Sequence, residues 1–119
     1  MLQKLTILGP GLLGGSIGLA ARHRKTAKRV VIWARRQEAA DEAWKLGAAD
    51  EATTDLAKAV ADADLVVFAT PIGAMTALAE QIKPVLREGC VVTDVGSVKG
   101  NWVSVWEKAA RPLRFIAAH

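Results

Sequence analysis

Residues 9–14 read Gly-Pro-Gly-Leu-Leu-Gly and follow the short apolar run 5–8. A strand, a glycine-rich turn and a segment with helical spacing together form the first βα unit of a dinucleotide-binding sheet. In such a turn Gly9 permits the tight bend, Gly11 lets the backbone approach a pyrophosphate, and Gly14 lets the helix lie close to the strand.

The predicted helix begins at Leu12 and Leu13, directly after the turn. A helix N-terminus offers free N–H groups and the positive end of a dipole to phosphates. We therefore expect a cofactor to be bound by the backbone of Gly9, Gly11, Leu12, Leu13 and Gly14. The alternative is a tight βα turn that holds no ligand.

Apolar runs and helical segments alternate along the chain. The runs are apolar throughout, which indicates strands buried on both faces, and helices between them require parallel strands with crossovers. Right-handed crossovers then give an α/β fold with a Rossmann-like doubly wound parallel sheet, in a single domain over residues 1–119. Pro84 is expected to disturb the helix that contains it. The predicted strands cover about 4–8, 29–33, 65–69, 90–94 and 113–118, and the predicted helices about 12–24, 37–46, 54–61, 72–87 and 98–110.

Composition limits the functions open to this chain. Its 119 residues are 51% hydrophobic and 24% charged, with a net charge of +4, which is ordinary for a soluble globular domain. No basic stripe interleaved with aromatic residues supports nucleic-acid binding. No apolar run has the length of a membrane span or the form of a secretory signal, so a cytoplasmic protein is expected. Cys90 lies in an apolar run, which predicts a buried strand residue and leaves no cysteine-based metal site.

The end of the second predicted strand bears on the choice of dinucleotide. NAD-binding sheets carry an acidic residue there, about 20 residues beyond the glycines, which binds the ribose 2′-hydroxyl. Here that position is Ala34, and Arg35 and Arg36 follow it. No carboxylate would repel a 2′-phosphate, and arginine binds phosphate oxygens through paired hydrogen bonds. The pattern favours NADP; the alternative is NAD held without the acid, with both arginines solvated.

Residues 94–99 read Asp-Val-Gly-Ser-Val-Lys, after a predicted buried strand and at the start of a predicted helix. Ser97 is well placed to cap that helix, and this structural role would explain it without any ligand. Because ligands of doubly wound sheets bind at the carboxyl ends of the strands, the functional interpretation places Ser97 and Lys99 near a nicotinamide.

Four segments together resemble the prephenate dehydrogenase family, which includes arogenate and cyclohexadienyl dehydrogenases. They are residues 9–16, the Ala-Thr-Pro of 69–71, the Asp-x-Gly-Ser-x-Lys element of 94–99, and a last predicted strand that ends in His119. The resemblance implies an oxidoreductase that decarboxylates prephenate or arogenate oxidatively on the route to tyrosine, with NAD or NADP as cofactor.

The resemblance also implies roles for individual residues. Thr70 and Pro71 match the stretch that lines the nicotinamide side of the site. Ser97 matches a serine that bonds near the nicotinamide and the reacting hydroxyl, and His119 matches the catalytic histidine. The helical second domain of the family, which binds substrate and forms a homodimer, is expected to be absent from this chain, so the isolated chain is expected to be inactive.

Two other functions stay open at this point. An oxidoreductase acting on β-hydroxyacids or imines has a similar first domain, although residues 94–99 argue against it. A module that senses a dinucleotide without turnover would suit a chain with no substrate domain.

Overall fold

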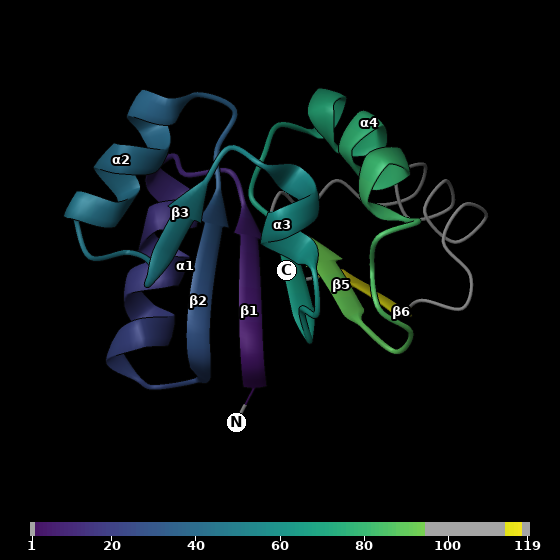
Figure 1. Cartoon of the computed structure of the whole chain (residues 1–119), viewed down its shortest axis with the longest axis horizontal. Coiled ribbons are helices and arrows are strands. Elements are labelled where there is room, and N and C mark those ends of the chain that lie inside the picture. Colours follow the sequence, from purple (N-terminus) through teal and green to yellow (C-terminus); the bar gives the residue numbers. More distant parts are fainter. Residues whose placement is uncertain (1, 95–113, 118–119) are drawn as a thin grey trace.

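The computed structural model describes residues 2–94 and 114–117, which form one six-stranded parallel sheet with helices on both faces (Figure 1). The strand order is β3-β2-β1-β4-β5-β6, and every neighbouring pair is parallel. The predicted Rossmann-like doubly wound sheet is therefore confirmed. The strands are β1 (Leu2–Leu8), β2 (Ala27–Trp33), β3 (Glu51–Thr53), β4 (Leu65–Phe68), β5 (Val91–Asp94) and β6 (Arg114–Ala117). The helices are α1 (Leu12–His23), α2 (Gln37–Lys45), α3 (Leu56–Val60) and α4 (Ile72–Ile82).

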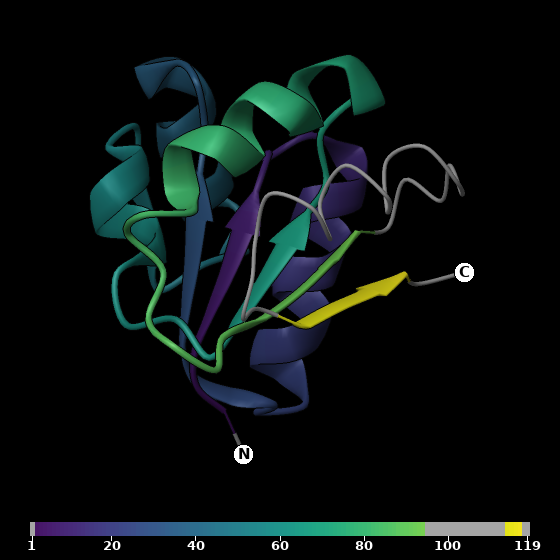
Figure 2. The same cartoon turned by 90° about the vertical axis from the view of Figure 1, so that its right-hand side faces the viewer.

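The central strands are apolar throughout because both of their faces are covered. In β2, Val30 and Ile32 join a core cluster with Ala21 of α1, whereas the intervening Val31 joins a second cluster with Met75 of α4. Successive side chains of a strand point to opposite faces, so α1 and α2 cover one face of the sheet and α3 and α4 cover the other. Figure 2 shows α1 and α3 on opposite sides of the strands.

One strand was not predicted and several boundaries differ from the prediction; β1 and β2, for example, begin earlier than predicted, at Leu2 and Ala27. Strand β3 was not predicted, because its three residues are too short to show a pattern of their own. Helix α3 begins at Leu56 instead of about 54, since the Asp55 side chain accepts a hydrogen bond from the Lys58 backbone N–H at 3.1 Å and so caps the helix. Helix α4 ends at Ile82, two residues before Pro84, where the 72–87 prediction was too long.

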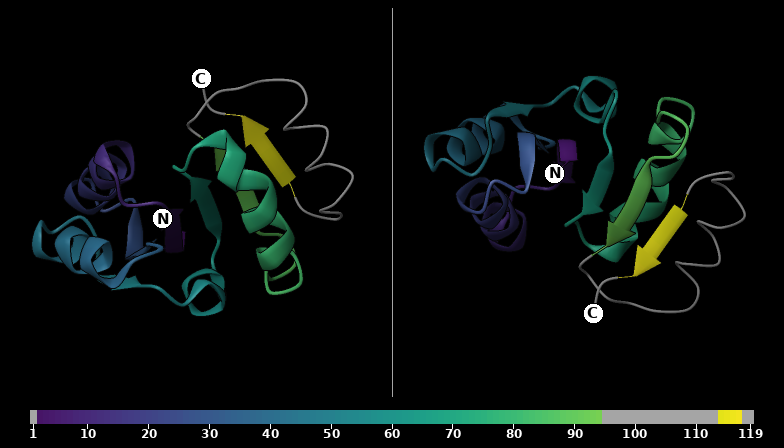
Figure 3. Two further views of the ribbon diagram at one scale, coloured as in Figure 1. Left: turned by 90° about the horizontal axis from the view of Figure 1, so that it is seen from above. Right: turned by 90° about the horizontal axis from the view of Figure 1, so that it is seen from below.

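The far edge of the sheet follows the prediction in outline. Strand β5 matches the predicted 90–94 segment, and β6 lies beside it within the predicted 113–118 segment (Figure 3). The predicted helix over 98–110 lies outside the described residues. Of the helices that the structure describes, none is long and apolar enough to cross a membrane.

Polar side chains of β1 hold helix α3 against the sheet. The buried ammonium group of Lys4 donates to the carbonyl oxygens of Lys58 at 3.2 Å and Ala61 at 2.6 Å, and the Thr6 hydroxyl donates to Ala59 O at 2.6 Å. Burial lowers the pKa of Lys4, with further lowering by the charge of Arg29. The C-terminal end of α3 is thus held by two side chains of β1.

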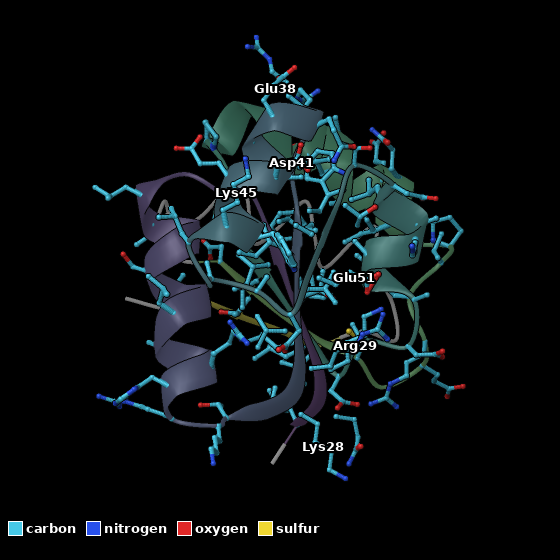
Figure 4. The ribbon with its side chains drawn as sticks, turned by 60° about the vertical axis from the view of Figure 1, so that its left-hand side comes forward. Lys28, Arg29, Glu38, Asp41, Lys45 and Glu51 are labelled. Atoms are coloured by element: carbon cyan, nitrogen blue, oxygen red, sulfur yellow. The ribbon has the colours of Figure 1, made fainter. Side chains whose placement is uncertain are left out.

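The carboxylate of Asp64, the residue before β4, links the start of β4 to the start of β1. Asp64 accepts hydrogen bonds from the backbone N–H groups of Gln3 and Lys4 and pairs with Arg87. The Lys4 N–H, the Gln3 N–H and Arg87 hold the pKa of Asp64 below its usual value. A separate ion pair joins Arg29 of β2 to Glu51 of the neighbouring edge strand β3 (Figure 4).

Candidate functional site

The candidate site lies where three neighbouring strands end together. Gly9 follows β1, Ala34 follows β2, and Ala69 follows β4; β1 lies between the other two. The Gly9 N–H donates to Trp33 O and the Ala69 N–H to Leu8 O, both at 2.9 Å. This carboxyl edge is where open α/β sheets bind ligands.

The glycines of the loop differ in what an added side chain would meet. Gly9 has φ +117°, and a Cβ there would lie 2.8 Å from Ala69 O. A Cβ on Gly14 would lie 1.9 Å from Gly9 O, so α1 can approach the loop this closely only with glycine at this position. At Gly11 an added Cβ would meet nothing within 4 Å. Contacts within the protein explain the first two glycines, whereas no such contact among the described residues would bar a side chain at Gly11.

The N-terminus of α1 faces this loop with its backbone donors available. No side chain caps the helix, and its first turn carries no acidic residue. The first hydrogen bonds within the turn come from the Gly15 N–H, to Pro10 O at 2.7 Å and Gly11 O at 3.0 Å. The N–H groups of Leu12, Leu13 and Gly14 therefore belong to the first turn, which a helix leaves without internal acceptors and which attracts anions.

A cleft of about 360 Å³ opens beside the loop. Five of the predicted site residues meet there: Gly9, Gly11, Arg35, Thr70 and Pro71. The hydroxyl oxygen of Thr70 is buried and has no hydrogen-bond partner among the described residues, and a buried hydroxyl that lacks one is costly unless a bound molecule supplies it. The remaining lining residues are Pro10, Trp33, Ala69 and Ala74.

Other predicted residues lie near the cleft without lining it. Ala34 is fully buried, and its N–H donates to Thr53 O at 3.0 Å. Arg36 is exposed at the N-cap position of α2. Ser97 and His119 fall outside the described residues, so their placement stays a prediction.

Trp33, the last residue of β2, also lines the cleft, although the sequence did not predict it as a site residue. It is 6% exposed, and its indole N–H donates to Thr54 O at 3.0 Å. The guanidinium carbon of Arg35 lies over the indole ring, 5.8 Å from its centroid. Among the described residues Arg35 has no ion-pair partner. The sequence signal for this contact was an aromatic residue at a strand end, two positions before an arginine. The strand pattern alone assigns such an aromatic residue to the core.

A second groove, of about 460 Å³, lies between α1 and α2. Its lining is mostly apolar and includes Leu12, Leu19 and Leu46, with Glu42 as the one charged group. It offers no cation to a phosphate, so the smaller cleft is the better candidate for a dinucleotide.

The described residues do not provide metal or thiol chemistry. They contain no group of three or more histidine, cysteine or carboxylate side chains that could hold a metal ion. Cys90 is buried as predicted, and burial raises the pKa of its thiol to about 11, so it stays protonated near neutral pH.

Comparison with known proteins gives consistent matches. Residues 17–119 match the family model described as prephenate dehydrogenase, nucleotide-binding domain. The cyclohexadienyl dehydrogenase of Zymomonas mobilis is 32% identical over 97 residues, covering 82% of this chain and 33% of that protein. The prephenate dehydrogenase of Bacillus subtilis is 32% identical over 122 residues, covering 100% of this chain and 33% of that protein. The chain therefore spans about a third of the length of these relatives.

A solved structure agrees in fold as well as in sequence. The prephenate dehydrogenase of A. aeolicus, in complex with hydroxyphenyl propionate and NAD+, has a TM-score of 0.90 and 29% identity to this chain. The match covers 100% of this chain and 42% of that one.

Proposed function

Because the chain belongs to the family of prephenate dehydrogenase nucleotide-binding domains, we propose that its carboxyl-edge cleft binds the nicotinamide dinucleotide of a prephenate or arogenate dehydrogenase. The observation that carries the proposal is the loop geometry. Gly9 and Gly14 are required by contacts within the protein, whereas the space over Gly11 is open and lies beside the N-terminus of α1. This is the arrangement that a pyrophosphate needs.

The residues of the cleft fit such a ligand. The backbone N–H groups at Leu12 and Leu13 would bind the pyrophosphate across Gly11. The orphaned Thr70 hydroxyl would gain a partner, and Pro71 would limit the cleft on the nicotinamide side. When bound, the nicotinamide supplies the hydride acceptor for the reaction.

We further propose that NADP binds more tightly than NAD. Ala34 presents no carboxylate at the end of β2, and the exposed Arg35 lines the cleft with no described acidic partner. A guanidinium group placed there is suited to the 2′-phosphate that distinguishes NADP.

Calorimetric titration of the 119-residue chain with NADP and NAD tests both proposals. A charge-assisted hydrogen bond contributes about 1.5–3 kcal/mol, so Arg35→Ala should weaken NADP binding about 10- to 100-fold and leave NAD nearly unchanged. Lys45→Ala, at the C-terminal end of α2 (Figure 4), removes the same charge as a control. Tighter binding of NAD by the unmodified chain would contradict the cofactor assignment, and binding of neither would contradict the site.

For the chemical step we propose that His119 accepts the proton of the substrate hydroxyl while hydride leaves the same carbon, with Ser97 helping to place that hydroxyl. A neutral imidazole suits this role because its pKa lies near the working pH. Loss of carbon dioxide then makes the ring aromatic. We propose that the groups that bind the substrate carboxylates belong to the helical domain that the family resemblance implies.

Replacement of the histidine tests this mechanism. In a protein that also carries the substrate-binding region, His119→Asn should reduce turnover about 100-fold or more. Cofactor affinity, measured by titration, should be nearly unchanged. Full turnover in this variant would remove His119 from the mechanism.

A further inference from the structure

We propose that Trp33 is a positioning residue for cofactor selection: its ring holds Arg35 at the cleft, so that Arg35 and not Arg36 binds the 2′-phosphate. This inference rests on the proposed NADP preference. It adds a residue that does not itself touch the phosphate, and it assigns different roles to two adjacent arginines.

The indole ring of Trp33 is fixed from several sides. The residue ends β2, is 6% exposed, and belongs to the core cluster that includes Phe68 and Met75. Its N–H donates to Thr54 O at 3.0 Å, which ties the ring to the turn between β3 and α3. A ring held by the core and by a hydrogen bond provides a stationary surface at the lip of the cleft.

Arg35 lies over that surface. Its guanidinium carbon is 5.8 Å from the ring centroid, within the range of a cation–π contact. An exposed arginine otherwise loses much rotamer freedom when it binds a ligand. A guanidinium group resting on an aromatic face keeps its N–H edges available, and less freedom is lost when these donate to phosphate oxygens.

Arg36 lacks this support. It follows Arg35 directly but occupies the N-cap position of α2, with φ −115° and ψ 144°, and it does not line the cleft. Its backbone carbonyl accepts the Ala40 N–H at 3.1 Å. Arg35 lines the cleft and lies over the Trp33 ring, whereas Arg36 starts α2. The two arginines therefore should not substitute for one another.

A double-mutant cycle tests the coupling between the ring and the arginine. Dissociation constants for NADP and NAD are measured by calorimetry for the unmodified chain, Trp33→Leu, Arg35→Ala and the double variant. We expect Trp33→Leu to weaken NADP about 3- to 10-fold more than NAD. In the Arg35→Ala background the same change should alter both cofactors equally.

The probes 2′,5′-ADP and 5′-AMP, which differ only in the 2′-phosphate, repeat the measurement without the nicotinamide half. If Trp33→Leu does not fold by circular dichroism, Trp33→Phe replaces it: its smaller ring is no longer fixed by the hydrogen bond to Thr54 O, so NADP should again weaken more than NAD, and only in chains that keep Arg35. Arg36→Ala should weaken 2′,5′-ADP less than Arg35→Ala does.

The outcomes separate this inference from the proposed function. A chain that binds NADP preferentially but shows equal effects of Trp33→Leu with and without Arg35 overturns the role of Trp33 alone. A larger loss from Arg36→Ala than from Arg35→Ala overturns the assignment of Arg35. A chain that binds neither cofactor overturns the proposed function, and this inference with it.

Discussion

Gly11 and Gly14 carry the same residue type for opposite reasons. A side chain on Gly14 would overlap the Gly9 carbonyl oxygen, whereas one on Gly11 would enter open space. The predicted close approach of the helix at Gly14 is confirmed, whereas the predicted approach of a pyrophosphate at Gly11 stays a prediction. The two positions are told apart by the distance from an added Cβ at each glycine to the surrounding atoms.

Gly11→Val is expected to abolish dinucleotide binding and leave the fold intact, because the added side chain would occupy the place of the pyrophosphate. Calorimetry should then show no binding of NADP or NAD, with an unchanged circular dichroism spectrum. Retained affinity would mean that the loop does not cradle phosphate.

Gly14→Ala should instead lower the free energy of unfolding by about 1–3 kcal/mol or more, since the overlap is with backbone that cannot rotate away. Urea denaturation measures the loss. Gly73→Ala is the matched control, because a Cβ at this exposed helical position would meet nothing within 4 Å. An unfolding free energy for Gly14→Ala equal to that of the control would contradict the close approach of α1.

At the scale of elements, uniform apolar runs and glycine or proline boundaries predicted the long strands and helices. Strand β3 was missed because three residues carry no periodicity, and it is defined by pairing with β2. The attachment of α3 was missed for another reason. Lysine is usually a surface residue, so nothing in the sequence indicated that Lys4 is buried. The packing of α3 across β1 buries it beside two carbonyl groups.

Lys4→Met is expected to lower the free energy of unfolding by about 1–3 kcal/mol, since the carbonyls of Lys58 and Ala61 would lose their donor inside the protein. Lys28→Met, at an exposed position of the neighbouring strand β2, should change it by about 0.5 kcal/mol or less. Urea denaturation at neutral pH compares the two. Equal losses would mean that the ammonium group does not support α3.

For the molecule as a whole, stability should fall in acid. The pKa of Asp64 is held below its usual value of 3.8, first by the Lys4 N–H, then by the Gln3 N–H, and also by Arg87. A carboxyl whose folded-state pKa is lowered stabilises the protein above its unfolded-state pKa, and this contribution disappears as the pH falls through the folded-state pKa. Arg29 lowers the pKa of Glu51 as well, which gives a dependence of the same sign.

The expected result is a free energy of unfolding that declines as the pH drops below about 4. Asp64→Asn should be less stable at neutral pH and should show a shallower decline, with the part due to Glu51 remaining. Asp41→Asn, in an exposed carboxylate of α2, serves as the control and should keep the full decline. Urea denaturation across this pH range decides between them, and parallel curves for Asp64→Asn and the unmodified chain would refute the assignment.

Because the strands run parallel, all of them begin at one rim of the sheet and end at the opposite rim. The structural contacts and the candidate site lie at these two different rims. Lys4 and Asp64, which make structural contacts, lie where the strands begin, and the residues proposed to bind the cofactor lie where the strands end. Sites this far apart without shared partners change stability nearly independently. Directed evolution of cofactor choice could therefore randomise positions 34–36 and 70 while the opposite rim preserves the scaffold, and stabilising changes made at that rim first would widen the range of substitutions that the binding rim tolerates.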